Sequence, residues 1–161
     1  MDDDNEKPRS PYGDRECDDV AEFQRKFGFI TSDKPSHLTI AKLTERLECL
    51  LEEVDEFEKS VQWQDLAEMA DALVDLVYFA KGTAVMLGLP WRALWDDVQR
   101  ANMAKERGVT KRGHSEDVMK PEGWVPPQTE QILVLAGYNP YAFADPETGT
   151  VLDENCVDYK K

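Results

Sequence analysis

Apolar residues recur every three or four positions through two early segments of the chain, which is the spacing of an amphipathic helix. The first segment follows Asp18 and Asp19, either of which can cap a helix, and it ends at Gly28. The second segment covers about residues 39–60. Its apolar positions are Leu43, Leu47, Leu50, Leu51, Val54 and Phe57.

Two more helices are predicted further along the chain. The third covers about residues 65–87 and is closed by Gly88, and the fourth begins at Pro90. A short polar connection at residues 60–64 separates the second helix from the third. After Gly108 the periodicity stops, and five of the nine prolines follow. The pattern therefore predicts an all-α fold, a helical bundle of about four helices with an extended C-terminal arm.

The chain divides into three regions on this pattern. Residues 1–17 are rich in Asp, Pro and Arg without periodicity, and we expect a disordered acidic leader there. Residues 18–107 form the predicted helical domain, and residues 108–161 form the irregular arm. A length of 161 residues suits one such domain.

Charge and cysteine content exclude several classes of function. Lys and Arg number 19 against 33 Asp and Glu, a net charge of −14, which argues against nonspecific binding to nucleic acid or to anionic membranes. Cys17, Cys49 and Cys156 are isolated, so we expect free thiols in a reducing compartment and no zinc site. The acidic start has no apolar run and is no signal peptide, so we expect a cytoplasmic protein.

A stripe of carboxylates interrupts the third predicted helix. Glu68, Asp71 and Asp75 recur at spacings of three and four, so they share one face. From Ala70 onward the helix is apolar almost all round, and we therefore expect it to be mostly buried. Carboxylates crowded on a buried stripe repel one another, and only Lys81 offers a basic side chain on the same helix.

Two explanations are open for this stripe. Basic residues of other helices can neutralise it, and Arg46, Arg92 and Arg100 are the candidates. A divalent cation is the explanation we favour, because carboxylate oxygens are the ligands that Mg²⁺ and Mn²⁺ prefer. Neither His37 nor His114 has a Glu three residues before it, which argues against a di-iron bundle.

The second predicted helix carries further carboxylates at intermediate positions. Glu53 falls at the border of the apolar face, about 40° beyond Phe57 on a helical wheel. For Glu53 the wheel favours a solvent-exposed surface residue and a functional residue equally. For Glu56 it favours a solvent-exposed surface residue. Glu45 and Glu48 face water.

Asn102 and Lys105 lie one turn apart at the end of the fourth predicted helix. Such a pair can reach phosphate oxygens, because lysine offers a mobile charge and asparagine offers two N–H donors. A frayed basic helix end, favoured by the helix dipole, explains the same residues, and the pattern alone puts this explanation slightly ahead.

Three segments together resemble a known family. EEVDEF (residues 52–57), EMADALVDLVYFAKGTAVMLG (residues 68–88) and RANMAK (residues 100–105) are similar to the MazG-like, all-α NTP pyrophosphohydrolases. The closest likeness is to the small bacteriophage-type members, which also resemble phosphoribosyl-ATP pyrophosphohydrolase. KPEGWVPP (residues 120–127) resembles the tail of those members, so the resemblance covers roughly residues 18–127.

The resemblance implies a set of metal ligands. Glu53 and Glu56 match the family's ExxE pair, and Glu68 and Asp71 match its ExxD pair. Asp75, one turn further along, is an additional candidate ligand. The family would hold roughly two or three Mg²⁺ or Mn²⁺ ions, with Glu53 or Glu56 as the catalytic base.

The resemblance also implies a reaction and an assembly. A nucleoside triphosphate, such as dGTP or a pyrimidine dNTP, would be hydrolysed to the monophosphate and pyrophosphate. Asn102 and Lys105 would then bind its phosphates. The expected assembly is a homo-oligomer, a helical dimer or tetramer with active sites near the subunit contacts.

Trp63, in the connection between the two carboxylate helices, is the first candidate for stacking on the base. If Trp63 only covers the end of the bundle, the base must be sought among Phe23, Phe27 and the arm with Trp124.

Two other classes of function compete with the enzyme. A non-catalytic helical interaction module would use the acidic stripes to bind a basic partner, leaving Asp71 and Asp75 exposed without metal. A nucleotide-binding regulator would keep the site without turnover.

Overall fold

The computed structural model describes residues 10–108, 117–140, 143–144 and 151–152. The all-α class is confirmed, because helices dominate and the strands form only two-residue antiparallel pairs, β1 with β2 and β3 with β4. The elements are α1 (Arg15–Phe27), α2 (Ile40–Trp63), α3 (Leu66–Met86), α4 (Trp91–Met103), β1 (Glu106–Arg107), β2 (Val118–Met119), α5 (Thr129–Leu135), β3 (Phe143–Ala144) and β4 (Val151–Leu152).

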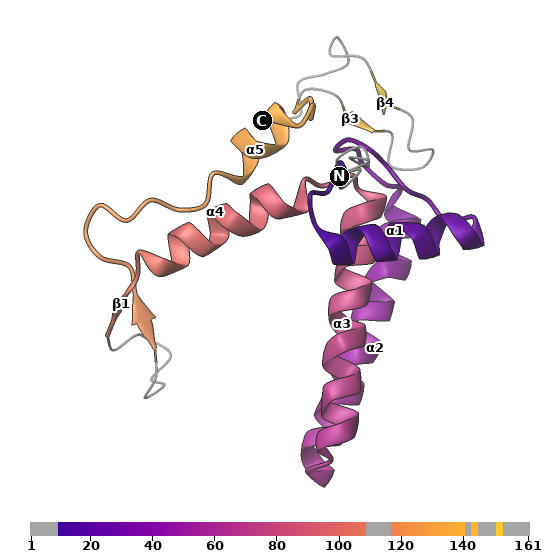
Figure 1. Ribbon diagram of the computed structural model, residues 1–161, viewed down its shortest axis with the longest axis vertical. Coiled ribbons are helices and arrows are strands. Elements are labelled where there is room, and N and C mark those ends of the chain that lie inside the picture. The colour runs from indigo at the N-terminus through magenta and orange to yellow at the C-terminus, as the bar shows by residue number, and fades with distance from the viewer. Residues whose placement is uncertain (1–9, 109–116, 141–142, 145–150, 153–161) are drawn as a thin grey trace, which may run out of the picture.

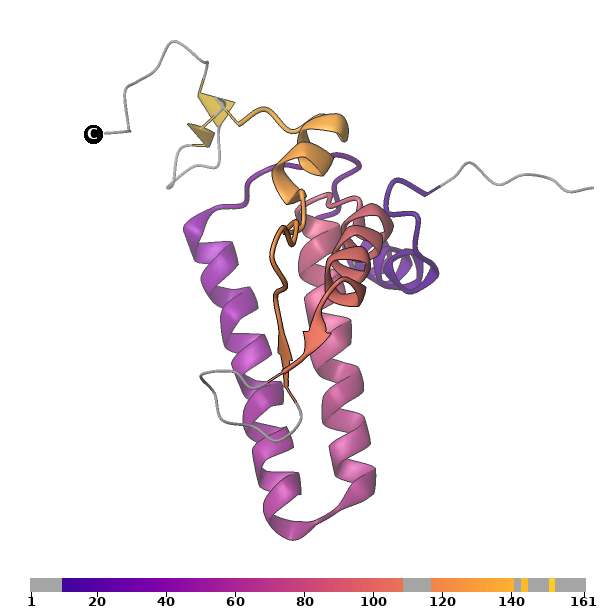
Figure 2. The same cartoon turned by 90° about the vertical axis from the view of Figure 1, so that its left-hand side faces the viewer.

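A long antiparallel hairpin of α2 and α3 is the main packing unit (Figures 1 and 2). Thr39 begins α2 by accepting a hydrogen bond from the Lys42 amide, and Asp65 caps α3 by accepting from the amides of Ala67 and Glu68. Gln64 turns the chain with a left-handed backbone, φ 52°. The connection is therefore shorter than the expected residues 60–64.

The buried core lies where α1 crosses the C-terminal half of α3. Tyr12, Cys17, Ala21 and Val85 form it, and Trp91 packs against them. Residues 12–17 therefore do not belong to a disordered leader, and that expectation was wrong for them. Burial of the Tyr12 ring orders this stretch, and its hydroxyl donates to the Ser32 carbonyl at 3.0 Å. Residues 1–9 of the expected leader lie outside the described residues.

The limits of α1 were predicted at one end only. Gly28 ends the helix in a left-handed conformation, φ 72°, as expected. Asp14, rather than Asp18 or Asp19, caps its start by accepting from the Cys17 amide at 3.0 Å. The helix begins earlier because Cys17 is drawn into the core.

A buried lysine ties α1 to α3. Lys81 Nζ lies 2.7 Å from Asp14 Oδ1 and 2.6 Å from Glu16 Oε2, and it sits 5.7 Å from the centre of the Trp91 ring. Burial alone would lower the pKa of Lys81, but the two carboxylates outweigh it and raise that pKa. Burial likewise opposes ionisation of Asp14, yet the bond from Lys81 lowers the pKa of that carboxyl.

The expectation that α3 is mostly buried holds only for its C-terminal part. Ala84, Val85 and Met86 are buried, whereas Leu73, Val74 and Val77 are between 46% and 65% exposed. The physical reason is that α1 covers only one end of the hairpin, and the end near the α2–α3 turn projects from the rest (Figure 1). Apolar residues of α2 are also exposed, at Leu47, Leu51 and Val54.

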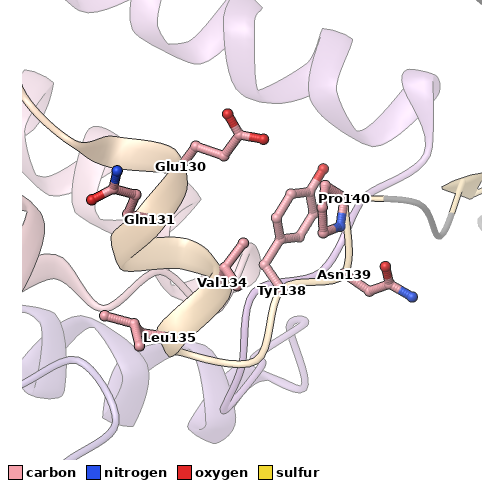
Figure 3. A pocket seen from close by; sticks show the side chains of 7 residues that line it. All are labelled: Glu130, Gln131, Val134, Leu135, Tyr138, Asn139 and Pro140. Carbon is pink, nitrogen blue, oxygen red and sulfur yellow. The ribbon is translucent and has the colours of Figure 1, made fainter.

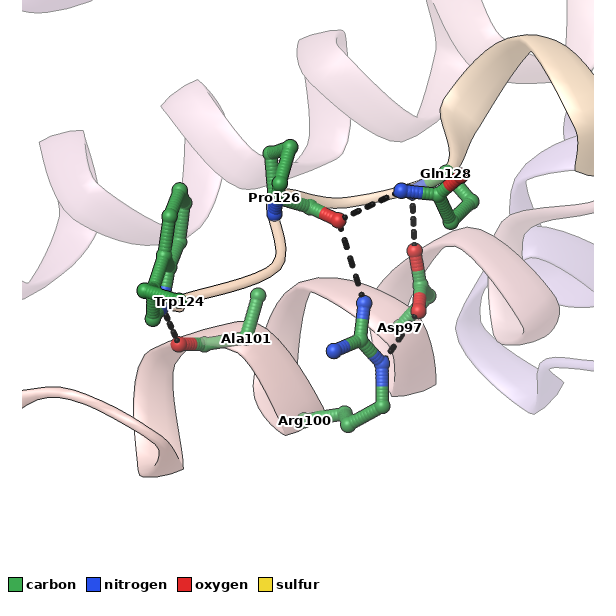
Figure 4. Close-up of polar contacts among 6 residues, drawn as sticks. All are labelled: Asp97, Arg100, Ala101, Trp124, Pro126 and Gln128. Atoms are coloured by element: carbon green, nitrogen blue, oxygen red, sulfur yellow. Dashed lines mark hydrogen bonds and ion pairs between the residues drawn. The ribbon is translucent and has the colours of Figure 1, made fainter. Parts of the chain in front are cut away.

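Helix α4 leaves the hairpin at a steep angle (Figure 1). The segment after β2, the first part of the C-terminal arm, runs back beside α4 (Figure 1). The Trp124 indole donates to the Ala101 carbonyl at 2.7 Å, and Arg100 donates to the Pro126 carbonyl at 3.2 Å (Figure 4). Asp97 accepts from both the Arg100 guanidinium and the Gln128 amide. These bonds fix the first part of the arm to α4.

No single helix in the described ranges has the length and hydropathy needed to cross a membrane. Helices α3 and α4 pass that test only as a pair, and the chain bends by 120° between them.

Replacing Lys81 by Met should lower the free energy of unfolding by about 2 kcal/mol, because it strands Asp14 beside the core without its cation. Lys59→Met is the matched control, since Lys59 forms an exposed pair with Asp55 and its loss should leave the melting temperature unchanged. Thermal melting of both variants checks this. Equal melting temperatures for Lys81→Met and the wild type would contradict it.

Cys17 should resist alkylation in the folded protein. Burial, and then the charge of Asp14, raise the pKa of its thiol to about 12, and the thiolate is the reactive form. An unfolded thiol ionises near its usual value of 9.0, so this group also makes the fold less stable as the pH rises above that value.

Iodoacetamide treatment followed by peptide mapping should leave Cys17 unmodified until urea unfolds the chain. Cys49, which is free and partly exposed, is the internal comparison. Modification of Cys17 at the rate of Cys49 would contradict the expectation.

Cys156 and His114 lie outside the described residues.

Candidate metal and nucleotide site

Glu53 on α2 lies within electrostatic range of carboxylates on α3. Glu53 is the buried member, only 7% exposed, whereas Glu56, Glu68, Asp71 and Asp75 are exposed within one chain. Because the two helices run antiparallel, the middle of α2 lies beside the middle of α3, and the charges of Asp75 and Asp71 act on Glu53. Glu53, which the helical wheel placed at the border of the apolar face of α2, is therefore buried in the structure.

The environment of Glu53 disfavours its negative charge. Burial raises the pKa of its carboxyl, and the charges of Glu56 and Asp75 raise it further. Its Oε2 atom is buried and has no hydrogen-bond partner among the described residues. A carboxylate in this position calls for a donor or a cation that the described part of the chain does not provide.

Basic side chains do not neutralise the five predicted ligands. Within residues 10–108 and 117–140, no ion pair involves Glu53, Glu56, Glu68, Asp71 or Asp75.

The three arginines considered as partners are engaged elsewhere. Arg92 pairs with Asp96, and Arg100 pairs with Asp97. Arg46 donates to the Thr83 hydroxyl and the Phe79 carbonyl on α3. Contacts within one chain therefore do not support the explanation by basic partners.

The donor set suits a hard divalent cation, because it consists only of carboxylate oxygens. The orphaned Oε2 of Glu53 would give such an ion one ligand. In the part of the chain that the structure describes, no three acidic, thiol or imidazole groups converge on one point, so a shared ion would require these side chains to turn toward one another. Glu68 lies two turns from Asp75, toward the hairpin turn.

Asn102 and Lys105, the predicted phosphate-binding pair, contact each other but lie away from the carboxylates of α2 and α3. Lys105 Nζ donates to Asn102 Oδ1 at 2.8 Å at the end of α4. That helix points away from the α2–α3 hairpin (Figure 1), so one chain does not bring the two groups to Glu53.

Lys120 is a basic residue that sequence reasoning passed over. Its ammonium lies 4.5 Å from the centre of the Trp124 ring, and that of Lys105 lies 6.0 Å from the same ring. The signal was present in the KPEGWVPP segment, where Lys120 and Trp124 are four residues apart.

Trp63 lies at the tip of the hairpin. It is the last residue of α2, not part of a loop, and it is 82% exposed. Ten residues, about 15 Å of helix, separate it from Glu53. The structure therefore leaves its ring open to solvent, away from the centre of the carboxylate group.

A hollow of about 760 Å³ beside α5 involves none of the predicted site residues (Figure 3). Glu130, Val134 and Tyr138 are among the side chains that line it. All its lining residues come from α5 and the segment that follows, so it is separate from the carboxylate site.

Comparison with known proteins identifies the family of the helical region. The family model described as phosphoribosyl-ATP pyrophosphohydrolase matches residues 20–102, from α1 to the end of α4, and the chain belongs to this family. No curated protein matches the chain. Family membership implies nucleoside triphosphate pyrophosphohydrolase activity, and the family is generally Mg²⁺-dependent.

Replacing Asp75 by Asn should abolish turnover and leave the melting temperature without metal unchanged or raised, because it removes one charge from a repulsive group. Asp55→Asn is the matched control on the same hairpin, since Asp55 pairs with Lys59 away from the group. Melting curves in EDTA and rates in Mg²⁺ check both parts. A marked loss of stability without metal would instead show that Asp75 has a basic partner.

Proposed function

We propose that this protein is a Mg²⁺-dependent nucleoside triphosphate pyrophosphohydrolase. It converts a nucleotide such as dGTP or a pyrimidine dNTP, together with water, to the monophosphate and pyrophosphate. The observation that carries the proposal is Glu53, a buried carboxylate without a partner in the described chain, surrounded by further carboxylates in a family of pyrophosphohydrolases.

The carboxylates of the hairpin have two roles in this proposal. Glu53, Glu56, Glu68, Asp71 and Asp75 hold two or three Mg²⁺ or Mn²⁺ ions, as the resemblance implies. When bound, the ions neutralise phosphate charge and lower the pKa of the attacking water. Glu53 or Glu56 accepts the proton of that water while the water attacks the α-phosphorus. The bond to the bridging oxygen breaks, and pyrophosphate leaves.

A second copy of the chain completes the site in our proposal. The apolar residues left exposed on α2 and α3 favour a dimer or a tetramer, since large uncovered apolar faces mark contact surfaces. In such an assembly Asn102 and Lys105 of one copy reach the phosphates that the metal ions bind at Glu53 of the other. This arrangement accounts for the separation of the two groups within one chain.

The non-catalytic interaction module keeps one observation in its favour. Asp71 and Asp75 are exposed within one chain, as that function expects. Turnover that depends on metal separates the two functions. We also propose a cytoplasmic location, where the nucleotide pool is found and where isolated cysteines stay reduced.

A panel of all canonical NTPs and dNTPs, each with Mg²⁺ and with Mn²⁺, should identify at least one nucleotide that is split to the monophosphate and pyrophosphate. EDTA should abolish the reaction, because the carboxylates then lack their counter-charge. Chromatography of the products distinguishes pyrophosphate from orthophosphate. Full turnover in EDTA, or orthophosphate as the first product, would contradict the mechanism.

Subunit mixing should reveal a shared site. Glu53→Gln and Lys105→Ala homodimers are each expected to be inactive. After exchange, half of the dimers pair unlike copies and each has one intact site, so about a quarter of the wild-type rate should return. Exchange between wild-type protein and Glu53→Gln protein is the control, because it shows how the rate changes when active subunits are mixed with inactive ones. No recovery after verified exchange would place both residues in a site built by one chain.

A further inference from the structure

Two lysines face each other at one end of the ladder formed by β1 and β2. The last antiparallel pair at that end joins Glu106 to Met119. Extending the same register by one residue places Lys105 opposite Lys120. Like charges directly opposite each other in such a ladder are destabilising. The pairing therefore carries an electrostatic cost that an anion between the two side chains would remove.

Both ammonium groups lie beside one indole ring. Lys120 Nζ is 4.5 Å from the centre of the Trp124 ring, and Lys105 Nζ is 6.0 Å from the same point. The ring attracts each cation, but it carries no net charge that could cancel the repulsion between them. In the described parts of the chain, neither lysine forms an ion pair with a carboxylate. This is unexpected in a chain whose net charge is −14.

Contacts on two sides hold Trp124 in place. Its indole N–H donates to the Ala101 carbonyl of α4 at 2.7 Å (Figure 4). Its backbone amide donates to the Pro121 carbonyl at 3.1 Å, and this turn contains Gly123 with a left-handed backbone, φ 74°. Because the turn reverses the chain, Trp124 returns to the side chain of Lys120. The lysine pair is therefore fixed to the end of α4 through the first part of the arm.

Asn102 adds hydrogen-bond donors beside the lysine pair. Its side-chain oxygen accepts from Lys105 Nζ at 2.8 Å, so the two N–H donors of its amide are left for a ligand. The side chain of Lys120 is exposed, and Lys105 is half-buried. Two ammonium groups and an amide nitrogen suit an anion that offers several oxygens, and a chain of phosphates is such an anion.

We propose that Lys120, a residue of the C-terminal arm, binds the phosphate chain of the substrate together with Lys105 and Asn102. This inference rests on the proposed function and adds the arm to the substrate site. The phosphates neutralise the two opposed ammonium groups. Figure 1 places β1 away from the α2–α3 hairpin, so Lys120, like Lys105, serves the carboxylate site of another copy.

Lys120→Met tests the charge, because it removes the ammonium group and keeps an unbranched side chain beside Trp124. For the nucleotide that the substrate panel identifies, KM should rise about tenfold and kcat should change less than about threefold. The melting temperature without ligand should be unchanged or raised, because one of two opposed like charges is gone. Lys120→Arg keeps the charge and should hold KM within about threefold of the wild-type value.

Lys34→Met is the matched control. Lys34 is an exposed lysine in the loop before α2, and its replacement removes the same charge without a change in KM. Calorimetric titration of the full chain with inorganic tripolyphosphate in Mg²⁺ measures binding of the phosphate chain without a base or a sugar. The affinity should fall about tenfold in Lys120→Met and should not change in Lys34→Met.

These measurements separate the inference from the proposed function. Absence of nucleotide turnover, with tripolyphosphate affinity that depends on Lys120, would refute the enzyme and leave the anion site standing. Nucleotide turnover with pyrophosphate release, but with wild-type KM and affinity in Lys120→Met, would refute the role of Lys120 alone.

Two further results would also overturn the inference. A marked loss of melting temperature in Lys120→Met, with KM unchanged, would show that Lys120 only packs on Trp124. A loss of tripolyphosphate affinity with KM unchanged would place the bound anion outside the active site.

Discussion

Glu53 is a buried carboxylate of α2 near carboxylates of both α2 and α3, and the proposed metal site depends on that arrangement. Antiparallel packing of the hairpin brings these charges near one another. Because Glu53 is buried, solvent screens its repulsion from the other carboxylates less. Such a group destabilises the hairpin unless positive charge arrives from outside the described chain. A cation bound there would neutralise the carboxylates and link the two helices at once.

The two halves of α3 differ in what they contact. The C-terminal half holds α1 through a small apolar core and through Lys81, which is paired with Asp14 and Glu16. The half nearer the hairpin turn carries Glu68, Asp71 and Asp75 and exposed apolar residues, which in the proposed function would contact ligands and other copies of the chain.

Sequence patterns predicted the helices well, because caps and breakers act locally. Thr39, Asp65 and Gly28 mark helix ends by side-chain hydrogen bonds or by backbone freedom that depends on a few neighbouring residues. The early start of α1 was missed, because Tyr12 and Cys17 are ordered by contacts with distant parts of the chain. Exposure of α3 was also mispredicted, since composition does not show which elements are available to cover a helix.

The candidate site was predicted in part for the same reason. Regular spacing identified the carboxylates of α2 and α3, and the hairpin brings Glu53 near Asp71 and Asp75. Spacing gave no indication that α4 carries Asn102 and Lys105 away from them. The burial of Gln24 gave no signal in the sequence, because it results from packing against a distant part of the chain, where its Nε2 donates to the Gly82 carbonyl.

Anomalous diffraction from crystals of the full chain grown with Mn²⁺ tests the central claim most directly. The account predicts a manganese peak between α2 and α3, with Glu53 and Asp75 among its ligands. A structure that shows no manganese there, but a lysine or arginine of a second copy paired with Glu53, would contradict it.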